Sequence, residues 1–534
     1  MRGLPIPKSA QQWTLPRSRF PPKHHIVSPF ETIERAFQGD TEGGSVNRHI
    51  PIWTGRRLFV AATLLGFAVI TAPGSELSPA IVENYPGAAF ETTTPEAAGW
   101  SGEKLAEARS WSQQIAPTAA VMIIQHGLIV AEWGDTAVKS NLHSVRKSLL
   151  SALIGIAVDQ HKIDLGATVG NLGIDDNAPG LSPTEKTATV ADLLKARSGI
   201  YHPALYETPG MARRRPARGS HPPGTFWYYN NWDFNALGTI YERATGEWIF
   251  TALQGKIARP IGMQDYQPGD GEYVRGAASE HPAYPIRMSA RDLARFALLY
   301  LHDGRWKDRQ IVPSAWVRES TQSYSQAFPD QGLGYGYGYL WWIGFPSNNG
   351  APTVNVPPGT FAAMGAEGQY AFVIPAYDLV IVHRINSDVP IGTLPGQRKP
   401  EPTTPQLARL LWLVLSAAGD NDVGPDISLA HAAGDHLTDE ALKTALTGAT
   451  LSVGEVLAGG PYTWQLRADG ALSVLAGAEH RERFKGTWRV DGDHYCRTLS
   501  GPNAQEACFS VVANNSRLQF FDADGLMRFD TKAE

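Results

Sequence analysis

Two stretches near the ends of the central part of the chain alternate polar and apolar residues, and helical spacing dominates between them. The segments 119–133 and 365–383 each alternate around a short turn, which predicts two β-hairpins. Apolar residues recur at helical spacing in several segments, which are 144–160, 233–245, 289–302 and 405–418. These elements predict a mixed domain of hairpins and helices over 90–418.

The pattern changes after residue 418. Residues 419–435 are rich in Gly, Asp and Ala and predict a linker. From 436 to 534, short strand-like runs alternate with turns, which predicts a separate small β domain, barrel-like in character. Both cysteines, Cys496 and Cys508, fall on neighbouring segments of this domain. They are candidates for a cross-strand disulfide in an exported protein, and otherwise two unpaired apolar side chains.

The N-terminal region has a different character. Residues 1–55 are rich in Pro, Arg, His and polar residues without periodicity, which predicts disorder. Residues 56–75 combine two arginines, an apolar run over 58–71 and a small-residue exit, as an export signal does. The run is shorter than the roughly 20 residues of a spanning helix. We expect export to a bacterial periplasm by a Tat-like or Sec signal, with 58–71 a candidate membrane tether. Translation from near Val46 would explain the long extension.

Length and composition narrow the class of protein. The 534 residues exceed one compact core, and 43% hydrophobic with 19% charged residues is typical of soluble globular proteins. The net charge of −5 does not indicate the basic surface with which proteins bind nucleic acid. The sequence contains no C-x-x-C or H-E-x-x-H pattern, and no serine stands in G-x-S-x-G. We therefore expect neither a metal nor another cofactor.

Candidate chemistry begins with Ser144 and Lys147. At the start of a helix, positions i and i+3 share a face, so the Ser144 hydroxyl would lie beside the Lys147 amine. Serine is a weak nucleophile that needs a neighbouring base, and a buried lysine has a lowered pKa that suits this role. The spacing predicts a nucleophile and its general base.

A second Ser-x-x-Lys, Ser101 to Lys104, has a simpler explanation. Ser101 is a good N-cap for a polar helix. A Tyr-x-Asn near residue 230 adds a phenol for proton transfer and an amide for binding a carbonyl. Two registers fit, Tyr228 with Asn230 and Tyr229 with Asn231.

The sequence resembles the penicillin-binding and β-lactamase-like serine hydrolases, which include class C β-lactamases, DD-peptidases, family VIII esterases and 6-aminohexanoate-oligomer hydrolases. The resemblance spans roughly 95–415. Its motifs occur in order, and they are Ser144–Lys147, the T-V-A-D-L-L and R-S-G-I phrases at 189–200, Tyr229-Asn230-Asn231 between Pro223-Gly224 and Leu237-Gly238, and 288–296. These flanks place the family's Tyr-x-Asn on Tyr229 and Asn231.

The third motif of the family, K-T-G or H-x-G, is where this sequence departs. Its best match is Ala366-Glu367-Gly368, without the Lys or His. The resemblance implies that the backbone N–H of Gln369, after Gly368, joins that of Ser144 as an oxyanion hole. Glu367 would repel a substrate carboxylate if it points inward. Arginines of the predicted loop 203–225 are an alternative source of positive charge, and these are Arg213, Arg214, Arg215 and Arg218.

The resemblance implies an α+β fold, an antiparallel sheet with flanking helices plus a helical lobe, with the serine between them. It implies a serine hydrolase in which Ser144 attacks an ester, amide or peptide, Lys147 is the base, Tyr229 the proton donor and Asn231 orients the substrate. The third motif favours an esterase or amidase over an efficient β-lactamase. The alternative is a slowly turning-over β-lactam or peptidoglycan sensor. The sequence leaves the oligomeric state open.

Overall fold

The computed structural model describes residues 84–328, 336–345, 354–388, 402–419, 423–424, 426, 428–453, 462–476, 481–501 and 504–533. The predicted disordered segment 1–55 and export signal 56–75 lie outside the described residues. Within the described residues, no helix combines the length and apolar character needed to cross a membrane.

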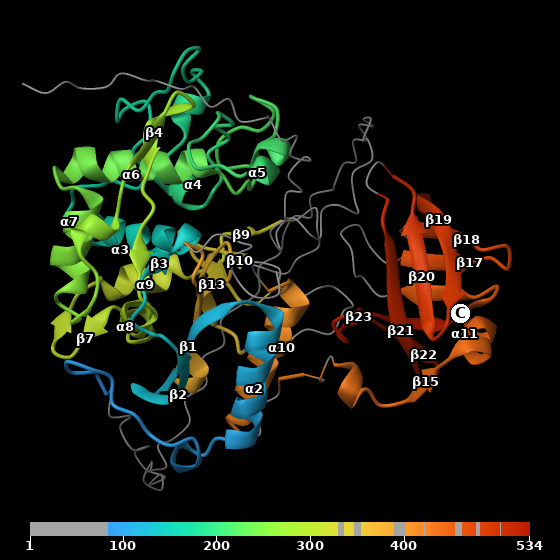
Figure 1. Ribbon diagram of the computed structural model, residues 1–534. Coiled ribbons are helices and arrows are strands. Elements are labelled where there is room, and N and C mark those ends of the chain that lie inside the picture. The colour runs from blue at the N-terminus through green and yellow to red at the C-terminus, as the bar shows by residue number, and fades with distance from the viewer. Residues whose placement is uncertain are drawn as a thin grey trace, which may run out of the picture.

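An antiparallel sheet forms the centre of the larger unit (Figure 1). Its strands, in spatial order, are β2 (Leu128–Gly134), β1 (Thr118–Gln125), β14 (Leu379–Ile385), β13 (Gln369–Ile374), β12 (Phe361–Gly365), β11 (Trp342–Ile343), β10 (Gly336–Tyr337) and β9 (Ser325–Gln326). Both predicted hairpins are present, since β1 pairs with β2 and β13 with β14. Strands from the two ends of the domain meet where β1 pairs with β14.

Helices cover both faces of this sheet. On one face α8 (Ala290–Leu301) packs against β13 and β14, and on the other α2 (Gly102–Ile115) packs with α10 (Thr404–Ala417) (Figure 1). Ser101 caps α2 by accepting a hydrogen bond from the Lys104 backbone, as the sequence predicts. Lys104 itself donates to the Ser416 carbonyl at 3.0 Å. The second Ser-x-x-Lys therefore serves to begin and anchor a helix.

A helical lobe stands on one side of the sheet (Figure 1). Its helices are α3 (Arg146–Asp159), α4 (Val190–Leu194), α5 (Pro209–Arg214), α6 (Asn231–Thr245), α7 (Ile249–Leu253) and α9 (Ser314–Ser320). Short ribbons complete the unit, and they are β3 (Ser140–Asn141) with β6 (Arg287–Met288), β4 (Val274–Gly276) with β5 (Ser279–Ala283), and β7 (Arg305–Trp306) with β8 (Arg309–Gln310). The predicted loop 203–225 is not wholly irregular, because Thr208 caps α5 within it.

The C-terminal strands close into a barrel. The spatial order is β15 (Asp435–Leu437), β21 (Glu506–Asn514), β20 (His494–Leu499), β19 (Arg481–Asp491), β18 (Ala471–Ala476), β17 (Tyr462–Leu466), β16 (Thr450–Val453), β23 (Met527–Ala533) and β22 (Arg517–Phe521). Pairing of β21 with β22 completes the ring. Helix α11 (Asp439–Leu446) buries Leu442 and Leu446 in the barrel core. The expected small β domain is therefore present.

Candidate active site

Ser144 lies in the tight turn His143–Val145 that leads directly into α3. His143 adopts a left-handed backbone with φ of 46°, and its N–H donates to Asn141 Oδ1 at 2.9 Å. This turn carries the chain from β3 into the helix. Ser144 is partly exposed, whereas Lys147, one helical turn further on, is only 2% exposed. The serine therefore faces the surface while the lysine lies beneath it.

The structure brings together Ser144, Lys147 and Tyr229, which come from two separate sequence motifs. Lys147 Nζ lies 2.9 Å from Ser144 Oγ and 2.7 Å from Tyr229 Oη. It also lies 4.4 Å from the centre of the Tyr229 ring and 4.7 Å from that of Phe234. The amine thus lies against aromatic carbon and within hydrogen-bonding distance of two hydroxyl groups.

Burial acts on these groups in opposite directions. Burial first, and the neighbouring Arg146 charge second, hold the pKa of Lys147 well below its usual range. Burial raises the pKa of Tyr229 to about 12. The amine is therefore biased towards its neutral form and the phenol towards its protonated form. A base and an acid lie within hydrogen-bonding distance of each other.

The structure distinguishes between the two possible registers of the Tyr-x-Asn motif. Tyr228 is buried and donates to the Met211 carbonyl at 2.8 Å. Asn230 caps α6 by accepting from the Trp232 backbone, and it donates to the Ile200 carbonyl at 2.6 Å. Both residues are engaged in holding the lobe together, and Tyr229 is the tyrosine that reaches Lys147.

Asn231 lies beside the cluster without bonding to it. Its Nδ2 donates to the Tyr206 carbonyl at 2.6 Å. Its Oδ1 is buried and has no hydrogen-bond partner among the described residues. Tyr206 itself has φ of 62°, a strained backbone for a non-glycine residue. The amide that the sequence assigns to substrate orientation is therefore turned towards the segment that carries Tyr206.

The third motif has a different geometry from the one expected. Gly365, the last residue of β12, approaches the serine so closely that a Cβ would lie 2.5 Å from the Leu142 carbonyl oxygen and 3.0 Å from Ser144 N. Gln369 stands opposite Gly365 on the next strand, β13. Its side chain is fully buried and donates to the Ile385 carbonyl at 2.9 Å. The close backbone approach therefore lies at Gly365, before Gly368 and Gln369.

Glu367 lies close to the turn that carries Ser144. Its carboxylate lies 3.6 Å from His143 Nε2, and its side chain is 37% exposed. His143 Nε2 also lies 3.1 Å from Ser387 Oγ. A carboxylate therefore stands beside the turn that carries Ser144.

Two of the loop arginines are paired within the lobe. Arg215 contacts Glu207, and Arg218 contacts the buried carboxylate of Glu185 at 2.7 Å. Of the two histidines that border this region, His202 lies 3.7 Å from Glu185, and His221 stacks on Phe226 with ring centres 4.0 Å apart. Arg215 and Arg218 are therefore compensated by neighbouring carboxylates.

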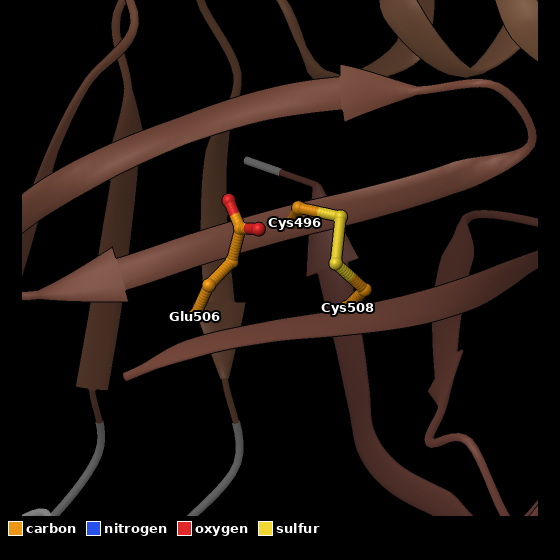
Figure 2. A group of neighbouring side chains, drawn as sticks. All are labelled: Cys496, Glu506 and Cys508. Atoms are coloured by element: carbon orange, nitrogen blue, oxygen red, sulfur yellow. A yellow bond between two sulfur atoms is a disulfide. The ribbon is translucent and has the colours of Figure 1, made fainter. Parts of the chain in front are cut away.

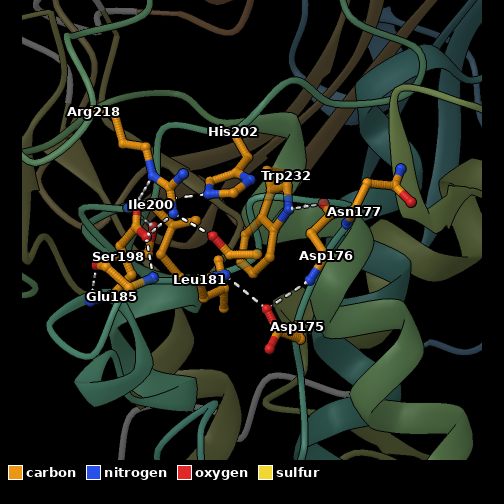
Figure 3. A network of polar contacts seen from close by, with 12 residues as sticks. Asp175, Asp176, Asn177, Leu181, Glu185, Ser198, Ile200, His202, Arg218 and Trp232 are labelled. Atoms are coloured by element: carbon orange, nitrogen blue, oxygen red, sulfur yellow. Dashed lines mark hydrogen bonds and ion pairs between the residues drawn. The ribbon is translucent and has the colours of Figure 1, made fainter.

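A polar network anchors the beginning of α6 (Figure 3). Asp176 accepts from Trp232 Nε1 at 2.5 Å, from Ser279 Oγ at 2.7 Å and from the Glu280 backbone at 2.8 Å. A cavity of about 300 Å³ adjoins this network. Its lining includes Asp176, Tyr201, His202 and Arg218, and it contains none of the three clustered residues.

The two cysteines are joined to each other. Cys496 on β20 and Cys508 on β21 face one another in register and form a disulfide (Figure 2). Glu506 lies near the sulfur atoms, and both of its carboxylate oxygens accept from Arg489 at 3.0 Å. These residues therefore form a crosslink and an ion pair.

The sheet, the helical lobe and the cluster between them define the class of β-lactamase and transpeptidase-like hydrolases. The chain belongs to the beta-lactamase family, whose model matches residues 103–399. Esterase EstB of Burkholderia gladioli is 31% identical over 108 residues, which cover 20% of this chain and 27% of that protein. Penicillin-binding protein 4 of Amycolatopsis lactamdurans is 24% identical over 335 residues, which cover 53% of this chain and 84% of that protein. The octameric penicillin-binding protein homologue from Pyrococcus abyssi has a TM-score of 0.43 and 16% identity, and the match covers 80% of this chain and 97% of that chain.

Proposed function

We propose that the protein is an esterase or amidase that works through an acyl-enzyme on Ser144. The observation that carries this proposal is the cluster in which buried Lys147 touches both Ser144 Oγ and Tyr229 Oη, at 2.9 and 2.7 Å. A neutral amine beside a hydroxyl is a general base for a serine nucleophile. Membership of the family supports a hydrolase, and we propose in addition the acyl-enzyme and the substrate class.

The first step forms the acyl-enzyme. Ser144 Oγ gives its proton to the Lys147 lone pair and bonds to the substrate carbonyl carbon, whose π electrons move to the carbonyl oxygen. The tetrahedral intermediate collapses, and the bond to the alcohol or amine leaving group breaks. Tyr229 protonates the leaving group and takes a proton back from the Lys147 ammonium. Water then repeats the sequence on the ester carbon, which releases the acid and restores Ser144.

Backbone N–H groups would stabilise the oxyanion. We place one at Ser144 and the second at the end of β12, where Gly365 leads into Ala366. The close approach at Gly365 supports this placement, because a Cβ there would lie only 3.0 Å from Ser144 N. Donors fixed in the backbone need no reorganisation as charge develops on the oxygen. In this mechanism the second oxyanion donor therefore lies next to Gly365, whereas the family resemblance of the sequence places it at Gln369.

The proposed substrate lacks a carboxylate near the reacting carbonyl. Glu367 stands next to the turn that carries Ser144, 3.6 Å from His143 within that turn, and neither a lysine nor a histidine occurs in the segment 363–366 beside the serine. A negative charge at this place disfavours an anionic substrate by direct repulsion. The similarity to the esterase of Burkholderia gladioli supports an ester in preference to a β-lactam.

Turnover of p-nitrophenyl butyrate, followed together with intact mass, tests the proposal. We expect steady hydrolysis, a transient mass increase of one acyl group, and loss of both in Ser144→Ala. Ser101→Ala is the matched control, because it removes the other Ser-x-x-Lys serine and only a helix cap. Ester hydrolysis that persists in Ser144→Ala would refute the proposal.

The alternative is a penicillin-binding sensor with slow turnover. The similarity to a penicillin-binding protein over 335 residues supports the sensor as this alternative. A fluorescent penicillin separates the two functions. Stable labelling of Ser144 without ester turnover would support the sensor, and rapid ester turnover without stable labelling would support the esterase.

We also propose that the protein is exported. The support is the signal-like sequence at 56–75 and the Cys496–Cys508 disulfide, a bond typical of oxidising compartments. N-terminal sequencing of the mature protein tests this. A mature chain that begins before Arg56 would contradict a cleaved signal.

A further inference from the structure

Arg146, the first residue of α3, is a buried cation without a carboxylate partner among the described residues. Its side chain is 1% exposed, and Nη1 donates to the His143 carbonyl at 2.8 Å. Nε and Nη2 are buried and have no hydrogen-bond partner in the described part of the chain. The guanidinium carbon lies 5.1 Å from the ring centres of both Tyr206 and Tyr284. Aromatic faces and one carbonyl therefore hold this charge.

This charge acts on the proposed base, because it lowers the pKa of Lys147 in addition to burial. Arg146 precedes Lys147 in the chain, and Lys147 is 2% exposed. Two neighbouring buried cations repel each other in a medium of low polarity. A guanidinium keeps its proton under all ordinary conditions, whereas a buried ammonium can lose one. The repulsion is therefore relieved when Lys147 becomes neutral.

No described carboxylate compensates the charge on Lys147. Helix α3 packs against α6, α7, α9 and the His143–Val145 turn. On the α6 side, burial raises the pKa of Asp233 well above its ordinary value, so this carboxyl is biased towards its uncharged form. Helix α7 has no titratable residue, and on α9 Arg318 is exposed while Glu319 accepts from Tyr339 at 2.9 Å.

The tyrosines around the site add no charge that could balance that of Lys147. Burial raises the pKa values of Tyr229, Tyr284 and Tyr337, so all three are biased towards their neutral forms. His143 lies in the turn that carries Ser144, and Glu367 lies 3.6 Å from it at the surface. Arg146 is thus the fixed buried charge adjacent to Lys147 in the described part of the chain.

We propose that Arg146 is a positioning residue of the reaction, a permanent buried positive charge that keeps the Lys147 amine unprotonated and ready to accept the Ser144 proton. It acts through Lys147 and does not touch the substrate. The inference rests on the proposed function, because it assigns the electrostatic control of the same site.

The experiment compares the pH profiles of kcat/KM for p-nitrophenyl butyrate in the wild type and in Arg146→Met. The acidic limb reports the loss of the proton from Lys147. Without the neighbouring charge we expect this limb to move to higher pH, by about 1 on the pH scale or more. At a pH below both limbs, an upward shift of the limb by about 1 pH unit should lower kcat/KM about tenfold. At high pH it should return to the wild-type plateau.

This return distinguishes electrostatics from structural damage, which lowers the whole profile without moving its limb. Arg146→Lys should move the limb as well, because a buried amine can release its own proton. Tyr284→Phe is the matched control. It keeps the ring against Arg146 and removes only the hydroxyl that donates to the Phe234 carbonyl, so the limb should stay in place.

If the Arg146 variants do not fold, the wild type can still overturn the inference. The Lys147 side chain can be titrated by NMR in ¹³C-lysine-labelled protein, with Lys147→Met providing the assignment. Titration near the ordinary lysine value of about 10.4 would overturn the inference. An unmoved acidic limb in Arg146→Met, with Ser144→Ala inactive, would refute this inference alone. Activity in Ser144→Ala would refute the proposed function instead.

Discussion

Tyr229 and Lys147 show how burial gives two neighbouring residues opposite roles. Burial raises the pKa of Tyr229 to about 12 and lowers the pKa of Lys147. Each change favours the uncharged form of its group. An uncharged phenol can donate a proton and an uncharged amine can accept one, so the pair can carry protons in both directions.

Tyr229→Phe tests the phenol. The variant keeps the ring that covers Lys147 and removes the hydroxyl 2.7 Å from Nζ. We expect kcat for an amide or a poor-leaving-group ester to fall about 10²-fold or more, because the leaving group loses its proton donor. A p-nitrophenyl ester needs little protonation and should lose less. Equal losses for both substrates would contradict this role.

Gly365→Ala tests the backbone approach to the serine. The added methyl group would lie 2.5 Å from the Leu142 carbonyl oxygen, so the turn before Ser144 must move. We expect kcat/KM to fall about 10²-fold, since small displacements at a reacting centre are costly. Gly255→Ala is the control, because a Cβ there meets nothing within 4 Å. Similar activity in both variants would contradict the assignment.

At the scale of elements, the beginning of α6 determines where Tyr229 points. Ser198 donates to Asp233 Oδ1 at 2.6 Å, and Asn230 donates to the same oxygen at 3.0 Å. These bonds tie the segment at Ser198 to the first turn of the helix. Tyr229 immediately precedes that turn and is therefore held against Lys147.

Asp233→Asn tests the protonation of this anchor. The folded pKa of Asp233 is raised, whereas the unfolded carboxyl ionises near about 3.9. The folded state therefore holds more protons, and this group lowers stability as pH rises above about 4 towards its folded pKa. We expect the melting temperature to fall less between pH 4 and pH 7 in Asp233→Asn than in the wild type. Identical slopes would show that Asp233 is ionised in the folded protein.

The helices and hairpins of the hydrolase unit could be predicted because their periodicity follows burial. The hairpins at 119–133 and 365–383 and the helix after Ser144 are present. The short helix α5 could not be predicted, since six residues in a Pro- and Arg-rich segment carry too little periodicity. Spacing and the family resemblance together indicated Ser144, Lys147 and Tyr229.

Gly365 and Arg146 could not be recognised from the sequence alone. The third motif is recognised by its lysine or histidine, and the segment Ala363–Met364–Gly365–Ala366 contains neither. The close contact at Gly365 exists only because β12 ends against the Ser144 turn. A charged residue in Ser-x-x-Lys is expected to face solvent, and burial of Arg146 depends on rings from distant segments.

At the scale of the whole molecule, the hydrolase unit and the barrel have distinct cores that meet at one surface. Trp464, Tyr495 and Phe520 fill the interior of the barrel. Phe521 and Met527 instead pack into the larger core of the hydrolase unit. Gln406 at the start of α10 donates to Asp524 at 2.9 Å across this contact. The barrel is therefore docked on the hydrolase unit.

Removing the disulfide tests the independence of the two cores. Cys496 and Cys508 are separated by 12 positions, and closing a loop of this size is worth about 3 kcal/mol. In Cys496→Ser/Cys508→Ser we expect the barrel transition to move to lower temperature in calorimetry. Ester hydrolysis by the folded protein should stay unchanged. Loss of activity before the barrel melts would contradict this separation.

The pairing of β21 has a consequence for solubility. Its first half pairs with β20, and its second half lies between β22 and the short strand β15. In the hydrolase sheet, backbone bonds from Thr93 and to Glu91 cover the outer side of β2 at Ile129. Unpaired strand edges are the templates on which chains add to one another into fibrils. Concentrated solutions of the folded protein should therefore resist growth of intermolecular sheets at both places.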